Sequence, residues 1–202
     1  MGKLRRLVLL RHGETNGESS IRFHGSGDVD LSAEGRAMMR RAAARIVPFP
    51  ELVVASPLRR SWRSASIVAD GRPVLLVPEF REIHFGRWEG LTLQEIEARD
   101  PILFADWRNR VSGFEYPGGE PRADFKARIA QGLGRLLATD AHDALAVVHK
   151  GVIRQIVDSL TGTAAPPDKP ELGEVLVVTR NPDATWFLGQ HSSNPPGLED
   201  AA

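Results

Sequence analysis

The sequence predicts an α/β fold, a three-layer α/β/α sandwich with a largely parallel central sheet. Short apolar segments that suit strands alternate along the chain with helical patterns. These segments are nearly unbroken, as expected for strands that helices cover on both faces. With 202 residues, 42% hydrophobic and 26% charged, the chain is long enough for one good core.

The apolar segments predict five strands. Each is short and rich in Val, Leu and Ala, with polar or turn-forming residues at its ends. The predicted strands are Leu4–Leu10, Glu51–Ala55, Val74–Val77, Ala144–Val148 and Val175–Thr179.

Five helices are predicted between and after these strands. Ser32 is placed to cap the first helix. Pro57 follows Ser56 and suits the first helical position of the second, where its missing N–H costs nothing. Thr92 and Glu95 have the spacing of a capping box at the start of the third. The predicted helices are Ala33–Ile46, Pro57–Ala69, Thr92–Arg99, Asp124–Ala138 and Val152–Leu160.

Composition sets the broad class of the protein. We expect one domain over residues 1–191 and a flexible, Pro-rich tail over 192–202. Acidic and basic residues balance to a formal net charge of zero, which favours neither nucleic acid nor membrane as a partner. The absence of cysteine excludes disulfides and thiolate catalysis. The first apolar run is too short for a signal peptide or a membrane span, so we expect a cytoplasmic protein, with a homodimer left open.

Histidines and arginines follow three of the predicted strands, in residues 11–13, 56–60 and 149–151. Ligands of open α/β sheets bind outside the carboxyl ends of the strands, so these three loops share one rim if the strands are parallel. Two histidines and at least two arginines then meet near a helix N-terminus. Such a pocket suits a phosphate group.

Six segments, in order along the chain, resemble the signatures of the histidine phosphatase superfamily, whose fold is phosphoglycerate-mutase-like. One such tripeptide alone would be weak evidence, but six ordered matches are specific. The segments are RHGET (11–15), RFHG (22–25), SPLRRS (56–61), EIHFGRWEG (82–90), PGGE (117–120) and VVHKGVIR (147–154).

The resemblance implies a catalytic group consisting of His12, Glu82, His149, Arg11 and Arg60. His12 would be the nucleophile that forms a phosphohistidine, and the neighbouring arginines should lower its pKa and keep it neutral. Glu82 would be the general acid. His149, expected to be protonated, would donate to the phosphoryl oxygens together with the arginines.

The resemblance also implies a set of phosphate- and substrate-binding residues. For Thr15 and Arg22 a loop-organising role is the alternative, and for His24 a packing role. The neighbouring Arg59 is expected to form a surface salt bridge, and Trp88 to lie in the core. The binding set is Arg11, Thr15, Asn16, Arg22, His24, Gly25, Arg60, Lys150 and Gly151.

Three positions depart from the family pattern, of which Pro121 replaces a Ser that usually follows PGGE. Glu18 stands where the family usually has Asn, and a carboxylate beside phosphate would be repulsive. Either Glu18 points away and Asn16 replaces it, or the loop differs. Lys150 replaces a small residue after the second histidine, where it adds a substrate-binding charge or lies in solvent.

The implied activity is hydrolysis of a small-molecule phosphate monoester without metal or cofactor, because guanidinium groups take over the charge role of a metal. The alternatives are a 2,3-bisphosphoglycerate-dependent phosphoglycerate mutase and a non-catalytic phosphate-binding module. The short segment between Glu82 and His149 lacks the paired arginines of the mutases. This favours the phosphatase branch, close to broad-specificity and α-ribazole phosphatases.

Overall fold

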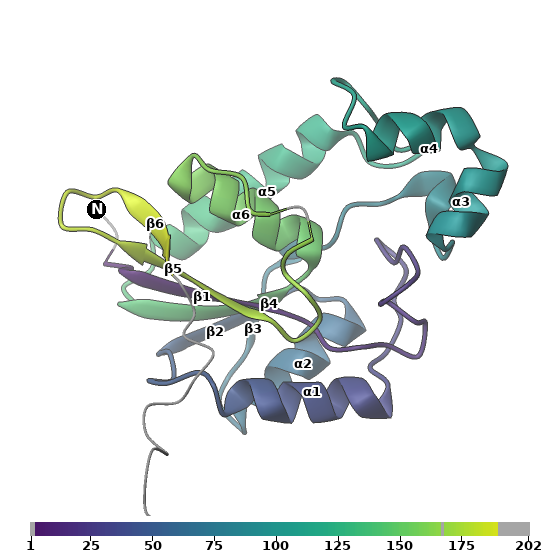
Figure 1. The fold of residues 1–202 in the computed structure, drawn as a ribbon. Coiled ribbons are helices and arrows are strands. Elements are labelled where there is room, and N and C mark those ends of the chain that lie inside the picture. The colour runs from purple at the N-terminus through teal and green to yellow at the C-terminus, as the bar shows by residue number, and fades with distance from the viewer. Residues whose placement is uncertain (1–2, 167, 190–202) are drawn as a thin grey trace, which may run out of the picture.

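One six-stranded sheet forms the centre of the protein (Figure 1), as described by a computed structural model for residues 3–166 and 168–189. The strand order is β3-β2-β4-β1-β5-β6. The first four of these strands pair in parallel with their neighbours. Strand β5 pairs antiparallel with β1, and β6 pairs antiparallel with β5. The predicted α/β fold with a largely parallel sheet is confirmed. The strands are β1 (Arg6–Arg11), β2 (Leu52–Ala55), β3 (Leu75–Leu76), β4 (Asp143–Val148), β5 (Val175–Arg180) and β6 (Trp186–Gly189).

Helices cover both faces of the sheet because side chains along each strand alternate between them. In β1, Leu7 and Leu9 join the core beneath α5 and α6, whereas Val8 and Leu10 join the core beneath α1 and α2. Figure 1 shows the same two layers on either side of the strands. The helices of the two layers are α1 (Ala33–Ala43), α2 (Arg59–Ala69), α5 (Arg122–Leu137) and α6 (Lys150–Thr161).

A third, smaller core lies beside the sheet under α3 (Leu93–Arg99) and α4 (Pro101–Arg108), which Figure 1 shows set apart from the strands. Trp88 is its centre, fully buried as predicted, and its indole N–H donates to Asp100 at 2.9 Å. This cluster supports the segment that leads away from Glu82.

Among the described residues, no helix has the length and apolar content to span a membrane.

Most predicted elements are present, and the differences have local causes. Ser32 and Thr92 cap α1 and α3 as predicted, the latter in a full capping box with Glu95. Helix α2 begins at Arg59 rather than Pro57, because the Ser56 hydroxyl accepts from the amide of Leu58 in a turn before the helix.

Helix α4 and strand β6 were not predicted. Helix α4 follows α3 after a single residue, Asp100, and the sequence analysis assigned no element to this segment. Strand β6 is an edge strand with little burial, which leaves a weak apolar pattern. The predicted tail over 192–202 lies outside the described residues.

Ser61 ties the start of α2 to the sheet. Its hydroxyl, fully buried, donates to the carbonyl of Val147 in β4 at 2.6 Å and accepts from the amide of Ser56 at 3.1 Å. The adjacent Arg60 is therefore fixed relative to the ends of β2 and β4.

Replacing Ser61 with Ala should lower the free energy of unfolding by about 1–3 kcal/mol, because a buried carbonyl and a buried amide lose a partner. Urea denaturation measures the change. Ser66→Ala is the matched control, since Ser66 lies on the same helix, is exposed and bonds only within it. Its expected effect is within about 0.5 kcal/mol. Equal effects of the two substitutions would contradict the tethering role of Ser61.

Candidate active site

The two histidines of the predicted site lie side by side at the ends of neighbouring parallel strands. Arg11 of β1 is paired in register with Val148 of β4, so the next residues, His12 and His149, leave the sheet together. The amide of His12 donates to the carbonyl of Val148 at 3.0 Å. The two rings are 5.2 Å apart between centroids, at 62° to each other, and both are buried.

The hydrogen bond of His12 fixes which ring nitrogen can react. Nδ1 lies 2.8 Å from the carbonyl of Gly13, and a carbonyl only accepts, so Nδ1 carries the proton and Nε2 keeps its lone pair. The pKa of His12 is well below its ordinary value, first because the ring is buried and then because Arg60 and Arg11 lie near. The ring of His12 is therefore neutral, with the lone pair of Nε2 free to act as a nucleophile.

Glycine is required after His12 because the chain passes so close to α1. A Cβ on Gly13 would lie 2.4 Å from the carbonyl oxygen of Gly35. The amide of Gly13 donates to Ser64 of α2 at 3.3 Å. The loop is thus clamped between α1 and α2, which holds His12 in place.

Arg60, in the first turn of α2, is fully buried. Its guanidinium donates to the carbonyls of Gly25 and Gly27 at 2.7 Å each, and to that of His24 at 3.0 Å. Burial is the main cause that lowers the pKa of Arg60 to about 10, with Glu82 the largest opposing influence. Because these carbonyls are neutral, the positive charge stays available to an anion.

Glu89 holds the loop that binds Arg60. Its carboxylate accepts from the amides of Gly25 at 3.1 Å, Ser26 at 3.0 Å and Phe85 at 2.9 Å. These bonds keep the pKa of Glu89 below its ordinary value despite partial burial. Sequence reasoning assigned no role to Glu89, although it is the Glu of the WEG tripeptide at 88–90.

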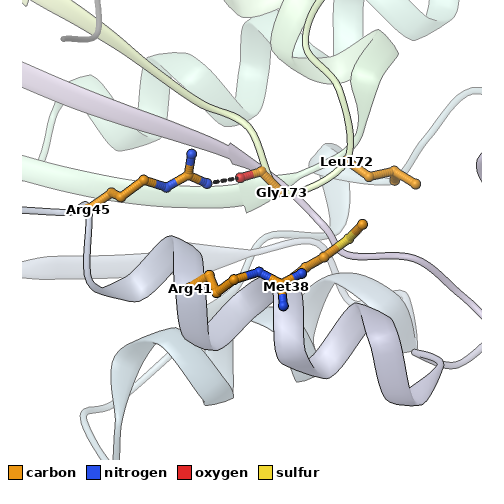
Figure 2. A pocket seen from close by; sticks show the side chains of 5 residues that line it. All are labelled: Met38, Arg41, Arg45, Leu172 and Gly173. Atoms are coloured by element: carbon orange, nitrogen blue, oxygen red, sulfur yellow. Dashed lines mark hydrogen bonds between the residues drawn. The ribbon is translucent and has the colours of Figure 1, made fainter. Parts of the chain in front are cut away.

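Arg11 is fixed by the segment after α6. Its guanidinium donates to the carbonyl of Pro170 at 3.0 Å, and burial lowers its pKa. The amide of Gly173 donates back to the carbonyl of Arg11 at 3.1 Å. Arg45, two residues after the end of α1, donates to the carbonyl of Gly173 at 2.8 Å, across a hollow of about 360 Å³ that Figure 2 shows. This hollow lies behind the loop and holds none of the predicted site residues.

Glu82 reaches the same site from the segment before Trp88. Its carboxyl oxygens accept from the amides of Ile83 and Gly151, both at 3.0 Å. Burial raises the pKa of Glu82 and outweighs the lowering by these bonds and by Arg60 and Arg11. A Cβ on Gly151 would lie 2.4 Å from a carboxyl oxygen of Glu82, so a side chain at this position would displace the Glu82 carboxyl.

Arg128 of α5 positions the backbone of Glu82 and was missed by sequence reasoning. Its guanidinium donates to the carbonyls of Glu79 at 2.5 Å, Arg81 at 2.6 Å and Glu82 at 3.1 Å. Both oxygens of Glu120 accept from the same guanidinium, at 2.6 and 2.8 Å. The available signal was the glutamate of PGGE, which needs a cationic partner when half-buried.

His149 differs from expectation in its charge. The sequence predicts an imidazolium, but burial lowers the pKa of His149 well below its ordinary value, with Arg60 and His12 adding to the effect. A neutral ring still has one N–H to donate. Neither ring nitrogen has a hydrogen-bond partner among the described residues, so both are available to a ligand.

Several predicted binding residues have partners in the surrounding segments. The Thr15 hydroxyl bonds to Ser19 at 2.8 Å. Arg22 donates to Glu95 at 2.9 Å and to Glu18 at 3.1 Å, so Glu18 points to Arg22. The side chain of Asn16 is exposed.

Three further predicted residues border the site. The ring of His24 bonds to the carbonyl of Gly17, while its own carbonyl accepts from Arg60. Gly25 also offers its carbonyl to Arg60. Lys150 donates to the carbonyl of Asp168 at 3.0 Å. Burial, followed by the charge of Arg11, lowers the pKa of Lys150.

Two further observations complete the site. Arg59 forms the predicted surface ion pair, with Asp28 at 3.0 Å. In the part of the chain that the structure describes, no three His, Asp or Glu side chains are grouped as metal ligands would be.

Comparisons of the sequence with known proteins find one family and several enzymes. The pattern of the histidine phosphatase superfamily (branch 1) matches residues 7–179. A glucosyl-3-phosphoglycerate phosphatase from Mycolicibacterium vanbaalenii is 33% identical over 171 residues, which cover 79% of this chain and 76% of that protein. An adenosylcobalamin/α-ribazole phosphatase from Salmonella typhimurium is 31% identical over 164 residues, covering 77% and 79%.

Solved structures with the same fold include two phosphatases. The α-ribazole phosphatase from Shigella flexneri superposes with a TM-score of 0.79 at 25% identity, over 96% of this chain and all of that one (100%). A mycobacterial glucosyl-3-phosphoglycerate phosphatase in complex with VO3 gives a TM-score of 0.78 at 30% identity, over 92% and 97%.

The lowered pKa values of His12 and His149 make stability depend on pH. Below about pH 6.5 these histidines bind protons in the unfolded chain but not in the folded chain. The free energy of unfolding should therefore decrease as the pH is lowered, by up to about 1.4 kcal/mol per pH unit for each histidine. His149→Gln should flatten the plot of unfolding free energy between about pH 5 and 7, measured by urea denaturation. The exposed His142→Gln is the control. A slope unchanged by His149→Gln would contradict a buried, neutral His149.

Proposed function

The chain belongs to the histidine phosphatase superfamily (branch 1) and is a phosphoric monoester hydrolase, and we propose that it acts through a phosphohistidine on His12 without a metal ion. The observation that carries this proposal is one buried group of side chains. His12 and His149 lie 5.2 Å apart between ring centroids, with Arg11 and Arg60 close enough to lower the pKa of both. Glu82 completes the group as a carboxyl with a raised pKa.

In the first half-reaction, Nε2 of His12 attacks phosphorus as the bond from phosphorus to the ester oxygen breaks. The proton of the Glu82 carboxyl passes to the leaving alkoxide, which departs as the alcohol. Arg11 and Arg60 balance the charge on the phosphoryl oxygens, and His149 donates its one N–H. The products are the alcohol, a phosphohistidine and the Glu82 carboxylate.

In the second half-reaction, water attacks the phosphohistidine and gives its proton to the Glu82 carboxylate. The bond between phosphorus and Nε2 breaks, inorganic phosphate leaves, and both residues return to their starting states. The raised pKa of Glu82 suits this double role, because one carboxyl must lose and regain a proton near neutral pH.

The substrate that we propose is a small phosphorylated metabolite. The relatives named above hydrolyse, by their names, glucosyl-3-phosphoglycerate and α-ribazole phosphates. A phosphoglycerate mutase would use the same phosphohistidine but return the phosphoryl group to a substrate hydroxyl. Product analysis separates the two: inorganic phosphate supports the phosphatase, and conversion of 3- to 2-phosphoglycerate supports the mutase.

His12→Asn should reduce hydrolysis of p-nitrophenyl phosphate by at least about a thousandfold, because the nucleophile is removed. The rate of phosphate release in the presence of EDTA measures this loss of activity. The same assay of the parent protein tests whether the reaction needs a metal ion. His142→Gln, a substitution of an exposed histidine, should leave the rate unchanged. Full activity of His12→Asn, or loss of parent activity in EDTA, would refute the proposal. A protein that binds phosphate without turnover would be a binding module.

Glu82→Gln should slow esters with poor leaving groups more than esters with good ones. For an alkyl phosphate, which needs the acid, we expect a loss of about a hundredfold or more in single-turnover phosphoryl transfer. For p-nitrophenyl phosphate, whose leaving group needs no proton, the loss should be much smaller. Glu97→Gln, exposed on α3, is the matched control. Equal slowing of both esters would remove Glu82 from the acid role.

A further inference from the structure

The backbone on either side of the His12 ring is held by hydrogen bonds from three directions. The amide of His12 donates to the carbonyl of Val148 at 3.0 Å, and the carbonyl of His12 accepts from the amide of Gly173 at 3.3 Å. The next amide along the chain, that of Gly13, donates to the hydroxyl oxygen of Ser64 at 3.3 Å. The first two partners are backbone groups. Ser64 is therefore the partner whose contact depends on the identity of a side chain.

Ser64 offers a lone pair, rather than a proton, to this amide. The residue lies in α2 and is fully buried. Its hydroxyl donates to the carbonyl of Arg60 at 2.6 Å, and since a carbonyl only accepts, the single hydroxyl proton is directed to Arg60. The oxygen is then left to accept from Gly13. One buried hydroxyl thus joins the residue after the proposed nucleophile to the residue whose guanidinium faces the phosphate in our proposal.

The peptide group between His12 and Gly13 is planar, so its carbonyl and its amide turn together. Gly173 holds the carbonyl and Ser64 holds the amide, so loss of the Ser64 bond leaves one end of the group free to rotate. Such a rotation also shifts the carbonyl of Gly13, which lies 2.8 Å from Nδ1 of His12 and keeps the proton on that nitrogen. Ser64 therefore acts on the contact that leaves the lone pair on Nε2.

Ser66, two residues further along α2, shows what is special about Ser64. Its hydroxyl donates to the carbonyl of Trp62 at 2.9 Å, four residues earlier, just as the hydroxyl of Ser64 donates to Arg60. Bonds of this kind are common for serines within helices. Ser66 is exposed, however, and its hydroxyl contacts no other element among the described residues. The two serines therefore differ in burial and in the contact with Gly13.

Helix α2 is thus fastened to both strands that carry the histidines. Ser61 donates to the carbonyl of Val147 in β4 at 2.6 Å, and Ser64 accepts from the loop that follows β1. Arg60 belongs to the same turn of the helix as these two serines. Its position relative to His12 is consequently set by bonds within one rigid element.

We propose that Ser64 is a positioning residue for phosphoryl transfer, whose hydroxyl holds the His12 loop so that Nε2 faces a phosphate group bound at Arg60. This inference rests on the proposed function, because it assumes that His12 is the nucleophile. Ser64 acts through Gly13 rather than on the substrate. Since the rate of attack depends steeply on alignment, loss of the hydroxyl should slow the attack on phosphorus without weakening the binding of phosphate.

Burst kinetics with p-nitrophenyl phosphate measure the attack, because p-nitrophenol is released as the phosphohistidine forms. Ser64→Ala should reduce the burst rate constant by about tenfold or more, whereas the inhibition constant for inorganic phosphate should change by less than about threefold. An alkyl phosphate should show the same reduction in single-turnover phosphoryl transfer. This separates Ser64 from Glu82, whose substitution should affect the two esters unequally.

A second pair of variants isolates the hydroxyl from the shape of the side chain. Thr and Val are nearly equal in shape, so Ser64→Thr should keep a burst rate constant at least about fivefold above that of Ser64→Val. Ser66→Ala is the matched control and should keep the parent rate. Urea denaturation establishes that each variant is folded at the temperature of the assay.

Equal burst rate constants for Ser64→Ala and Ser66→Ala, or for the Thr and Val variants, would overturn the role of Ser64. So would a phosphate inhibition constant that rises by the same factor as the rate falls, because the whole phosphate site would then be displaced. Absence of a phosphohistidine in the parent protein during turnover would instead refute the proposed function, and the role of Ser64 with it.

Discussion

Parallel pairing of β1 with β4 is the constraint on which the site depends. It brings two residues far apart in sequence, His12 and His149, to adjacent strand ends with their rings 5.2 Å apart. Because β2 pairs with the other side of β4, Arg60 follows from the third neighbouring strand. A shift of register by one residue would turn the end of each strand to the other face and separate these groups. The strand pairing that forms the sheet therefore also brings the site residues together.

Burial gives the site its chemistry. Removal from water lowers the pKa of both histidines and raises that of Glu82, which leaves neutral imidazole rings and a carboxyl that can hold its proton, as the proposed mechanism requires. The hydrogen bonds of Arg11 and Arg60 go to backbone carbonyls rather than to carboxylates, so these partners do not cancel the positive charge. The positive field is thus kept for a phosphate group. The supporting contacts from Glu89 and Arg128 act on the backbone around these residues, so they position the site from outside it.

Much of this could be predicted from the sequence, and the rest could not for physical reasons. Apolar runs such as Leu7–Leu10 mark buried strands, and residues that follow such strands at a shared rim can be expected to meet. The order of the strands, and an edge strand such as β6, depend on pairing partners that local pattern does not encode. The partners of long side chains are equally non-local. Thr15 and Arg22 belong to the family motifs, yet their side chains bond to Ser19 and Glu95. Arg128 lies outside the motifs, yet it holds the backbone carbonyl of Glu82. The protonation of His149 depends on burial among arginines, which only the folded arrangement shows.

The most direct measurement of the central claim is a crystal structure of the protein with orthovanadate, whose vanadium adopts the geometry of a phosphorus under attack. We predict vanadium bonded to Nε2 of His12, with vanadate oxygens contacting Arg11, Arg60 and His149 and one apical oxygen facing Glu82. Vanadate bound elsewhere, or bound with Nε2 of His12 turned away from the metal, would contradict it.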